Sequence, residues 1–129
     1  VPPGEDGVVG IGIDLDVNDL DASTRFYTHA MGYEHVGPGV VRAGDTRLFL
    51  HPASQPVPRQ EYRAPGFRYT TVQIFDCDQA HAYILARGGE EGRAPGTIGT
   101  TTRYSFVRDP DGNWIEVSHR FELTGDEPR

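Results

Sequence analysis

Apolar and polar residues alternate along residues 9–17, the first patterned stretch of the chain. The odd-numbered positions are all apolar, and the even-numbered positions are glycine or aspartate. Because successive side chains of a strand point to opposite faces, this pattern predicts a half-buried strand with a bare, acidic outer side. Apolar residues at helical spacing then predict a helix over residues 20–31, with Asn18 or Asp19 as its N-cap and Gly32 as its stop.

The next segment predicts short strands and then a linker. Strands are expected at residues 33–36, 40–42 and 47–51, separated by turns that contain glycine. Residues 52–66 contain four prolines in mostly polar company. Proline cannot donate a backbone hydrogen bond, so this stretch is expected to form neither a helix nor a central strand.

The second half of the chain repeats the first. A strand is expected at residues 67–75, a helix at 77–87 that stops at the glycine pair 88–89, and a long loop at 93–100. An offset of 57 residues places Asp19 on Asp76 and Gly32 on Gly89, so it preserves both the cap and the stop. This repetition predicts an internal duplication of a βαβββ unit.

Residues 102–120 predict a hairpin that carries an acid. The turn DPDGN at 109–113 joins two alternating strands, because proline presets its backbone angle and glycine accepts a positive φ. In the second strand Trp114, Glu116 and Ser118 share one face, and Ile115 and Val117 share the other. An offset of 67 places Phe49 of the first unit on Glu116.

We therefore expect one α+β domain over residues 1–129. It consists of a first unit at 8–51, a proline-rich linker at 52–66, a second unit at 67–119 and a tail at 120–129. Residues 122–129 are expected to fray, and residues 1–7 are expected to form a loose terminus.

Composition narrows the possible partners. The net charge of -7 argues against a nucleic-acid partner, which attracts lysine and arginine, and is compatible with cationic ligands. No apolar run reaches the roughly 18 residues of a membrane helix, so we expect no membrane partner. The single cysteine, Cys77, cannot form an internal disulfide, and a cytoplasmic location is expected.

The duplicated unit resembles the glyoxalase, bleomycin-resistance and extradiol-dioxygenase superfamily, also called the vicinal oxygen chelate superfamily. The resemblance covers nearly the whole chain. It rests on VNDLDASTRFY at 17–27 followed by Met31-Gly32, on IFDCD at 74–78, and on RDPDGNWIE at 108–116. The resemblance implies that the two tandem βαβββ units form a curved mixed sheet around a concave small-molecule cleft, with the helices on the convex side. It also implies a homodimer that shelters the concave face.

Enzymes of this superfamily hold a divalent metal on their concave strands. Carried over by position, the places of the metal ligands are Gly12, Phe49, Tyr69 and Glu116, of which only Glu116 is a good ligand. We therefore expect no metal and no other cofactor. A divalent metal held by a site rebuilt from Asp14 or His51, which lie two residues further along the same faces, remains the alternative.

Several side chains with the parity of the cleft are candidate ligand contacts. Trp114, Phe49 and Tyr69 form either a stacking wall for a planar ligand or a plug in a closed core. The predicted ligand-binding set is Asp14, Phe49, His51, Tyr69, Gln73, Trp114 and Glu116. The remaining histidines are expected outside the cleft, and Cys77 is expected to be a small buried residue.

Two classes of function follow. The first is a binding protein that sequesters a drug or natural product in an aromatic-lined cleft without metal. Asp14, Asp16 and Glu116 would then lie near the cleft and pair with cationic groups of the ligand. The second is a lyase, isomerase or dioxygenase, which either uses a rebuilt metal site or uses Glu116 or Tyr69 as its catalytic acid or base. The sequence does not identify the ligand or say whether a dimer exchanges units.

Overall fold

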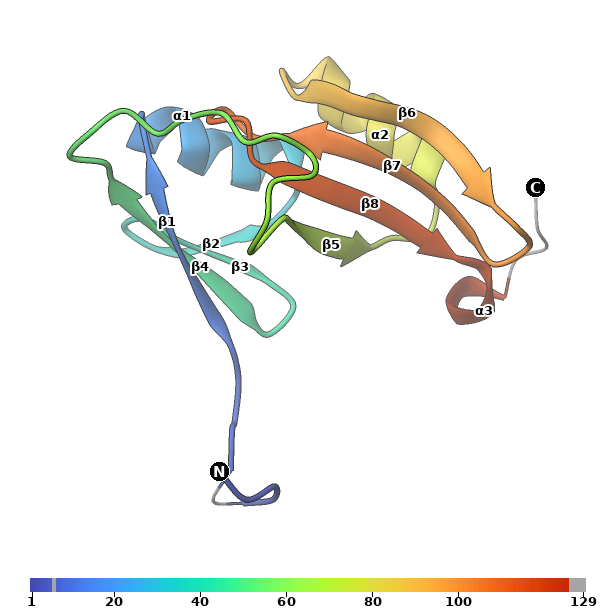
Figure 1. Ribbon diagram of the computed structural model, residues 1–129, viewed down its shortest axis with the longest axis horizontal. Helices are drawn as coiled ribbons and strands as arrows, with labels where there is room; N and C mark the ends of the chain where they lie inside the picture. The colour runs from blue at the N-terminus through green and yellow to red at the C-terminus, as the bar shows by residue number, and fades with distance from the viewer. Residues whose placement is uncertain (6, 126–129) are drawn as a thin grey trace.

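The chain folds into two four-stranded sheets, each with its own helix (Figure 1). The computed structural model describes residues 1–5 and 7–125. Its elements are β1 (Gly12–Val17), α1 (Leu20–Arg25), the π-helix η1 (Phe26–Ala30), β2 (Glu34–Gly37), β3 (Val40–Ala43), β4 (Thr46–Pro52), β5 (Tyr69–Gln73), α2 (Cys77–Ala86), β6 (Glu90–Ile98), β7 (Thr102–Arg108), β8 (Trp114–Arg120) and α3 (Phe121–Thr124). The predicted α+β class with repeated βαβββ units is confirmed.

The two sheets have the same topology. Sheet 1 has the order β1-β4-β3-β2, and sheet 2 has the order β5-β8-β7-β6. In each sheet the first strand runs parallel to the last because a helix carries the chain back, and the other pairs are antiparallel. Asp14 lies opposite Phe49 in sheet 1, and Thr71 lies opposite Glu116 in sheet 2. This register confirms both offsets, 57 between the first strands and 67 between the last.

One face of each sheet packs on the helices and forms the core. In sheet 1, Val17, Val41 and Leu48 are buried in the same cluster as Phe26 and Tyr27. In sheet 2, Ile115 and Val117 are buried with Cys77 and Ile84 of α2. The alternation along residues 114–118 is therefore as predicted, with Trp114 and Glu116 on the face that has no helix. Within the described residues no helix is long and apolar enough to cross a membrane.

The two helical segments begin alike and end differently. Asp19 and Asp76 cap them, and each carboxylate accepts a hydrogen bond from the backbone N–H three residues later. The first segment changes to a π-helix at Phe26, which inserts one extra residue. The left-handed glycines after the helices are consequently Gly32 and Gly88, with φ of 74° and 92°. The predicted match of Gly32 with Gly89 is wrong by one residue.

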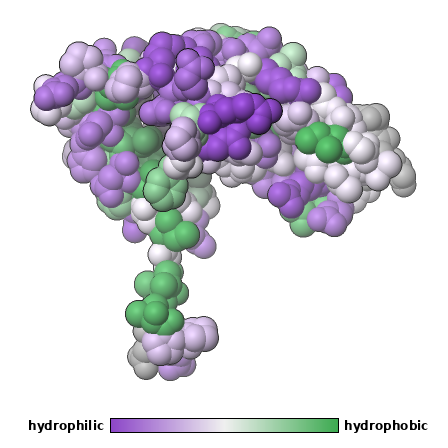
Figure 2. Space-filling model, in the orientation of Figure 1, coloured by the Kyte–Doolittle hydropathy of each residue, from purple (hydrophilic) through white to green (hydrophobic). Residues whose placement is uncertain are grey.

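Strand β1 begins later than predicted. The alternation of residues 9–17 indicates one strand, but only Gly12–Val17 pairs with β4. Val9 and Ile11 are 95% and 70% exposed. They belong to an extended arm that projects from the body, visible as the apolar stalk in Figure 2. An alternating pattern indicates which residues suit a sheet, but it does not show whether a neighbouring strand is present to pair with them.

Strand β6 is longer than predicted. Residues 93–100 were expected to form a loop, but β6 continues to Ile98 and includes Pro95. The strand lies at the edge of its sheet, where the missing N–H of a proline costs no ladder hydrogen bond, and its pairing with β7 has two register shifts. At the other edge, β5 spans Tyr69–Gln73 and is shorter than the predicted strand at 67–75.

The C-terminal segment is ordered further than expected. Strand β8 reaches Arg120, and Phe121–Thr124 form a short helix, α3, with Phe121 buried. The fraying predicted for residues 122–129 is therefore wrong for residues 122–124. Its last part, 126–129, and position 6 of the loose N-terminus lie outside the described residues.

A buried hydrogen-bond network joins the two units. The Tyr27 hydroxyl of unit 1 donates to Asp109 Oδ2 at 2.7 Å, in the turn between β7 and β8. The same carboxylate accepts bonds from the backbone N–H groups of Asp111 and Asn113. Burial, together with the Asp109 carboxylate, raises the pKa of Tyr27 well above its ordinary value, so the hydroxyl stays protonated. The Asn18 N–H donates to Asp111 Oδ1 at 3.1 Å.

We expect Tyr27→Phe to lower the free energy of unfolding by about 1.5–3 kcal/mol, because it leaves a buried carboxylate without one of its donors. Urea denaturation followed by circular dichroism measures this loss. Tyr33→Phe is the matched control, since Tyr33 packs its ring against Tyr27 but donates no side-chain hydrogen bond to any described residue. Equal losses in the two variants would contradict the role assigned to the Tyr27 hydroxyl.

Candidate functional site

The face of sheet 2 that points away from α2 is the richest candidate surface; we call it the open face of sheet 2. Three rows of cross-strand neighbours form it: Glu90, Arg108, Trp114 and Tyr69; Arg93, Phe106, Glu116 and Thr71; and Gly96, Tyr104, Ser118 and Gln73. Four of the predicted ligand-binding residues, Tyr69, Gln73, Trp114 and Glu116, therefore share this face.

An aromatic cluster of Tyr62, Tyr69, Phe106 and Trp114 covers one end of the open face. Tyr62 comes from the linker and stacks parallel to Tyr69, with ring centroids 6.2 Å apart. It meets Phe106 edge-on at 5.2 Å and Trp114 edge-on at 5.3 Å. Phe106 is the buried member of this cluster, and it does not belong to the core that packs on the helices.

The linker, residues 53–68, is anchored to the start of β8. The Trp114 Nε1–H donates to the carbonyl oxygen of Gln60 at 2.9 Å, and Arg108 donates to the same oxygen at 2.8 Å. Figure 1 shows the linker passing over the adjoining ends of β7 and β8. Sequence reasoning missed Tyr62 because its contacts are long-range. The available signal was a lone aromatic residue in a proline-rich segment.

Close packing under Trp114 requires a glycine. A Cβ atom at Gly92 would lie 2.6 Å from Cζ3 of the indole and 3.2 Å from the Cβ of Phe106. Any larger residue at position 92 would push the indole off the sheet. Trp114 is thus held between β6 and the linker, and it is only partly exposed.

Arginine side chains stack on the aromatic residues of the open face. The guanidinium of Arg68 lies 4.7 Å from the ring centre of Tyr62, that of Arg93 4.4 Å from Tyr104, and that of Arg108 4.5 Å from Trp114. Over the described part of the chain, Arg68 and Arg93 form no ion pair with a carboxylate. The acidic surroundings predicted from Asp14 and Asp16 belong to sheet 1. On the open face of sheet 2 the acidic residues are Glu90, which pairs with Arg59 and Arg108, and Glu116 in the middle row.

The other predicted residues lie on sheet 1. Asp14 Oδ1 is 2.7 Å from His51 Nε2, and the two side chains are 72% and 54% exposed. Phe49 lies opposite Asp14, and its ring covers Gly12 so closely that a Cβ there would be 2.9 Å from Cε2. Asp14, Phe49 and His51 are therefore neighbours of one another, on a different sheet from Glu116 and Gln73.

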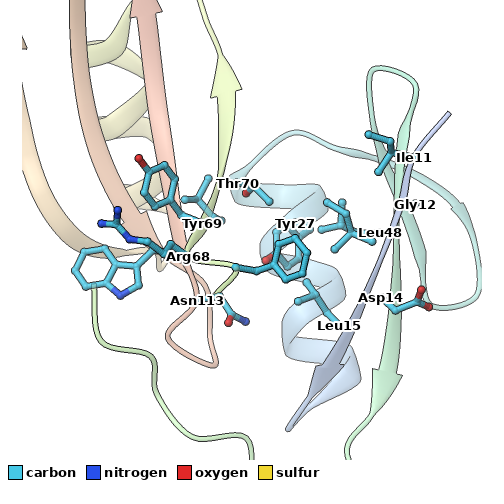
Figure 3. A pocket seen from close by; sticks show the side chains of 14 residues that line it. Ile11, Gly12, Asp14, Leu15, Tyr27, Leu48, Arg68, Tyr69, Thr70 and Asn113 are labelled. Carbon is cyan, nitrogen blue, oxygen red and sulfur yellow. The ribbon is translucent and has the colours of Figure 1, made fainter. Parts of the chain in front are cut away.

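A cavity of about 560 Å³ lies between the two sheets. Figure 3 shows Ile11, Gly12, Asp14 and Leu48 on one side of it and Arg68 and Tyr69 on the other. Trp114 and the fully exposed Phe67 also contribute to the lining, which is mostly apolar. Of the predicted set, the cavity brings together Asp14, Tyr69 and Trp114, whereas Phe49, His51, Gln73 and Glu116 lie outside its lining.

The side chains present do not fit a divalent metal. A catalytic metal needs about three protein ligands, and no three His, Cys, Asp or Glu side chains come together among residues 1–5 and 7–125. The ring of Phe49 fills the space where a ligand at position 12 would stand. Asp14 and His51 supply two donors, which already bond to each other.

The polar cluster on α2 has a structural explanation. His81 Nδ1 lies 2.8 Å from Ser105 Oγ, and His81 Nε2 lies 2.8 Å from Glu91 Oε2. Ser105 is fully buried, so it cannot meet a substrate, and the cluster ties α2 to β6 and β7. Cys77 is also buried, as predicted, and burial raises the pKa of its thiol.

Comparisons with known proteins agree on one superfamily. The sequence profile of the glyoxalase/bleomycin resistance protein/dioxygenase superfamily matches residues 12–117. A protein of Vibrio parahaemolyticus named "probable lactoylglutathione lyase" is 30% identical over 116 residues, which cover 80% of this chain and 84% of that protein. A protein of the same name from Vibrio cholerae is 29% identical over 121 residues, with the same coverage of both chains.

Solved structures show the same fold. A glyoxalase/bleomycin resistance protein/dioxygenase from Alicyclobacillus acidocaldarius superposes with a TM-score of 0.67 at 17% identity, over 89% of this chain and 94% of that one. An integron cassette protein from V. cholerae superposes with a TM-score of 0.62 at 25% identity, over 87% and 94%. The repeated units, the DPDGN turn and the profile match together establish that the chain belongs to the glyoxalase/bleomycin resistance protein/dioxygenase superfamily.

Proposed function

We propose that this protein binds a small molecule without metal on the open face of sheet 2, and that it sequesters a drug or natural product there. The observation that carries this proposal is the aromatic cluster around Trp114. Aromatic side chains supply most of the contact energy in ligand sites, and a few polar groups fix the orientation of the ligand. Glu116 and Gln73 lie on the same face as the aromatic cluster, and they are the polar groups that would orient the ligand.

The chemistry of the donors supports a role without metal. At the four positions where related enzymes keep metal ligands, this chain has glycine, phenylalanine, tyrosine and a single glutamate. In addition, Phe49 packs over Gly12. Three of these four positions therefore offer no good metal ligand.

An enzyme is the second candidate, favoured by the name of the two Vibrio relatives, "probable lactoylglutathione lyase". The chain would then need a metal site rebuilt from Asp14 or His51, or a metal-independent mechanism. In the latter, Glu116 or Tyr69 would act as acid or base. Metal content and turnover separate this candidate from the binding protein.

We also propose that the protein acts as a cytoplasmic homodimer. Sheet 1 ends in β1 and sheet 2 ends in β5, and unpaired sheet edges favour association. The exposed apolar side chains of Val9, Ile11 and Phe67 lie near these edges. A second copy would bury them and close the cavity between the sheets. A free buried thiol at Cys77 is consistent with a reducing compartment.

Purification without chelators should yield protein with much less than one transition metal per chain, because no three His, Cys, Asp or Glu side chains converge within residues 1–5 and 7–125. Elemental analysis by mass spectrometry measures this directly. Asp14→Asn serves as the matched variant, since it would reduce metal content only if the Asp14–His51 pair held an ion. One zinc, iron, manganese or nickel per chain would overturn the metal-free assignment.

Trp114→Ala should weaken binding of an aromatic ligand by about 1–3 kcal/mol, the amount typically lost with a buried aromatic contact. The ligand comes from a thermal-shift screen, and calorimetry measures its affinity. Phe75→Ala is the control, because Phe75 is an exposed aromatic residue outside the open face. Equal effects of the two changes would contradict the placement of the site.

Glu116→Gln in the same assays separates the two functions, because it preserves shape and removes charge. A binding protein shows no turnover with either form. In an enzyme that uses Glu116 for proton transfer, ligand binding persists while turnover collapses.

Light scattering at micromolar concentration should give about twice the chain mass of 14.2 kDa. Ile11→Asp should shift the protein toward monomer, since it places a charge on the exposed arm beside β1. Ile98→Asp changes an exposed isoleucine of β6 instead and should leave the mass unchanged. A 14 kDa species in the unmodified protein would refute the dimer.

A further inference from the structure

Tyr62 occupies a slot built for an aromatic ring. Tyr69 lies parallel to it, with an interplanar angle of 4°, and Phe106 and Trp114 meet it edge-on. Arg68 stacks on the ring at 4.7 Å from its centre. Three aromatic rings and the guanidinium of Arg68 thus contact the phenol ring, and the guanidinium of Arg63 lies 5.7 Å from its centre. Protein sites hold planar ligands with contacts of this kind.

The segment that carries Tyr62 is held by side-chain contacts and not by sheet pairing. Its backbone bonds to β1 only at the start, where the Ala53 N–H donates to the Val17 carbonyl, and no described residue of 54–66 pairs with a strand. The remaining anchors involve side chains. The Val57 N–H donates to Asn18 Oδ1 at 2.8 Å, and Arg59 donates to both carboxylate oxygens of Glu90. The Gln60 carbonyl accepts from Trp114 and Arg108, as described above. A segment without sheet pairing opens at a small free-energy cost compared with the strands beneath it.

Arginines line the rim of the slot, on a face that also carries Glu90 and Glu116. Arg63, Arg68 and Arg93 each stack on a tyrosine, and none of them has a carboxylate partner in the described part of the chain. The chain as a whole carries a net charge of -7. Unpaired guanidinium groups over aromatic rings favour aromatic anions, because the ring stacks and the anionic group pairs with the cation.

We propose that the slot filled by Tyr62 is the core of the ligand site, that residues 54–66 of the linker are its lid, and that the ligand is an aromatic anion of phenol size or larger. The ligand displaces Tyr62, takes its place against Tyr69, Phe106 and Trp114, and pairs its anionic group with Arg68 or Arg93. This proposal rests on the proposed binding function and adds the ligand class and the residue that competes with it. Tyr62 lowers the apparent affinity by the fraction of time that the slot is closed.

Three phenols of matched size and different charge test the proposal: 4-hydroxyphenylacetate, its neutral amide, and the cation tyramine. Calorimetry at pH 7 is run on the unmodified protein, on Tyr62→Ala and on Tyr62→Ala combined with Arg68→Gln. Tyr62→Ala should bind the anion about tenfold more tightly than the unmodified protein does. The order of affinity should be anion, amide, tyramine, and Arg68→Gln should reduce the advantage of the anion.

Equal affinity of Tyr62→Ala for the three probes would overturn the proposal, because it would indicate a plain apolar cavity left by the deleted ring. Equal affinity of Tyr62→Ala and the unmodified protein for the anion would also overturn it, since Tyr62 would then not compete. Hydrogen exchange on the unmodified protein gives an answer even if the variant fails to fold. The anion should increase exchange in residues 54–66, and reduced exchange there would contradict a displaced lid.

These outcomes separate this proposal from the proposed function. If another aromatic ligand binds and Trp114→Ala weakens it while 4-hydroxyphenylacetate binds neither form, the lid and the anion are wrong and the site stands. If no aromatic ligand binds either the unmodified protein or Tyr62→Ala, the proposed function is wrong as well.

Discussion

The buried carboxylate of Asp109 is the constraint on which the rest of the structure depends. It closes the turn before β8 through its backbone partners, and it holds the hydroxyl of Tyr27 from the first unit. A buried charge is tolerated only when several donors satisfy it, so this turn and this helix must meet in one geometry. The position of Trp114, the first residue of β8, follows from that contact.

Two glycine and aromatic pairs determine what the sheets offer a ligand. Phe49 lies over Gly12 in sheet 1, and Trp114 lies over Gly92 in sheet 2. In both places the absence of a Cβ lets a ring lie flat on the strands. Apolar surface therefore occupies positions where metal-binding side chains could have converged. The charged groups that remain are the Asp14–His51 pair on sheet 1, and the arginines, Glu90 and Glu116 on sheet 2.

Local features of the fold could be predicted from the sequence. The caps at Asp19 and Asp76 and the alternation around Glu116 depend on neighbours in the chain, and the structure contains them. The extra residue of the π-helix shifted the match between the glycines that end the two helices. Strand β1 begins only at Gly12 because the residues before it have no strand partner. Both depend on tertiary packing, which a period of two or of 3.6 does not encode.

The candidate site was only partly predictable for the same reason. Strand parity placed Tyr69 and Trp114 on one face, but it could not show that Tyr62 of the linker covers them or that Arg68 stacks there. The cationic rim also contradicts an inference from net charge, since a total of -7 says nothing about where three arginines gather.

The central claim is that a small molecule binds beside Trp114 without metal. Trp114 is the only tryptophan of the chain, so its indole N–H gives a single resonance in a nitrogen–proton NMR spectrum. That N–H donates to the linker at Gln60, and it reports any ligand that enters the cluster. Stepwise addition of an aromatic ligand in the presence of a chelator should shift this resonance until the shift saturates. Binding that leaves the resonance unmoved, or that requires added metal, would contradict the account.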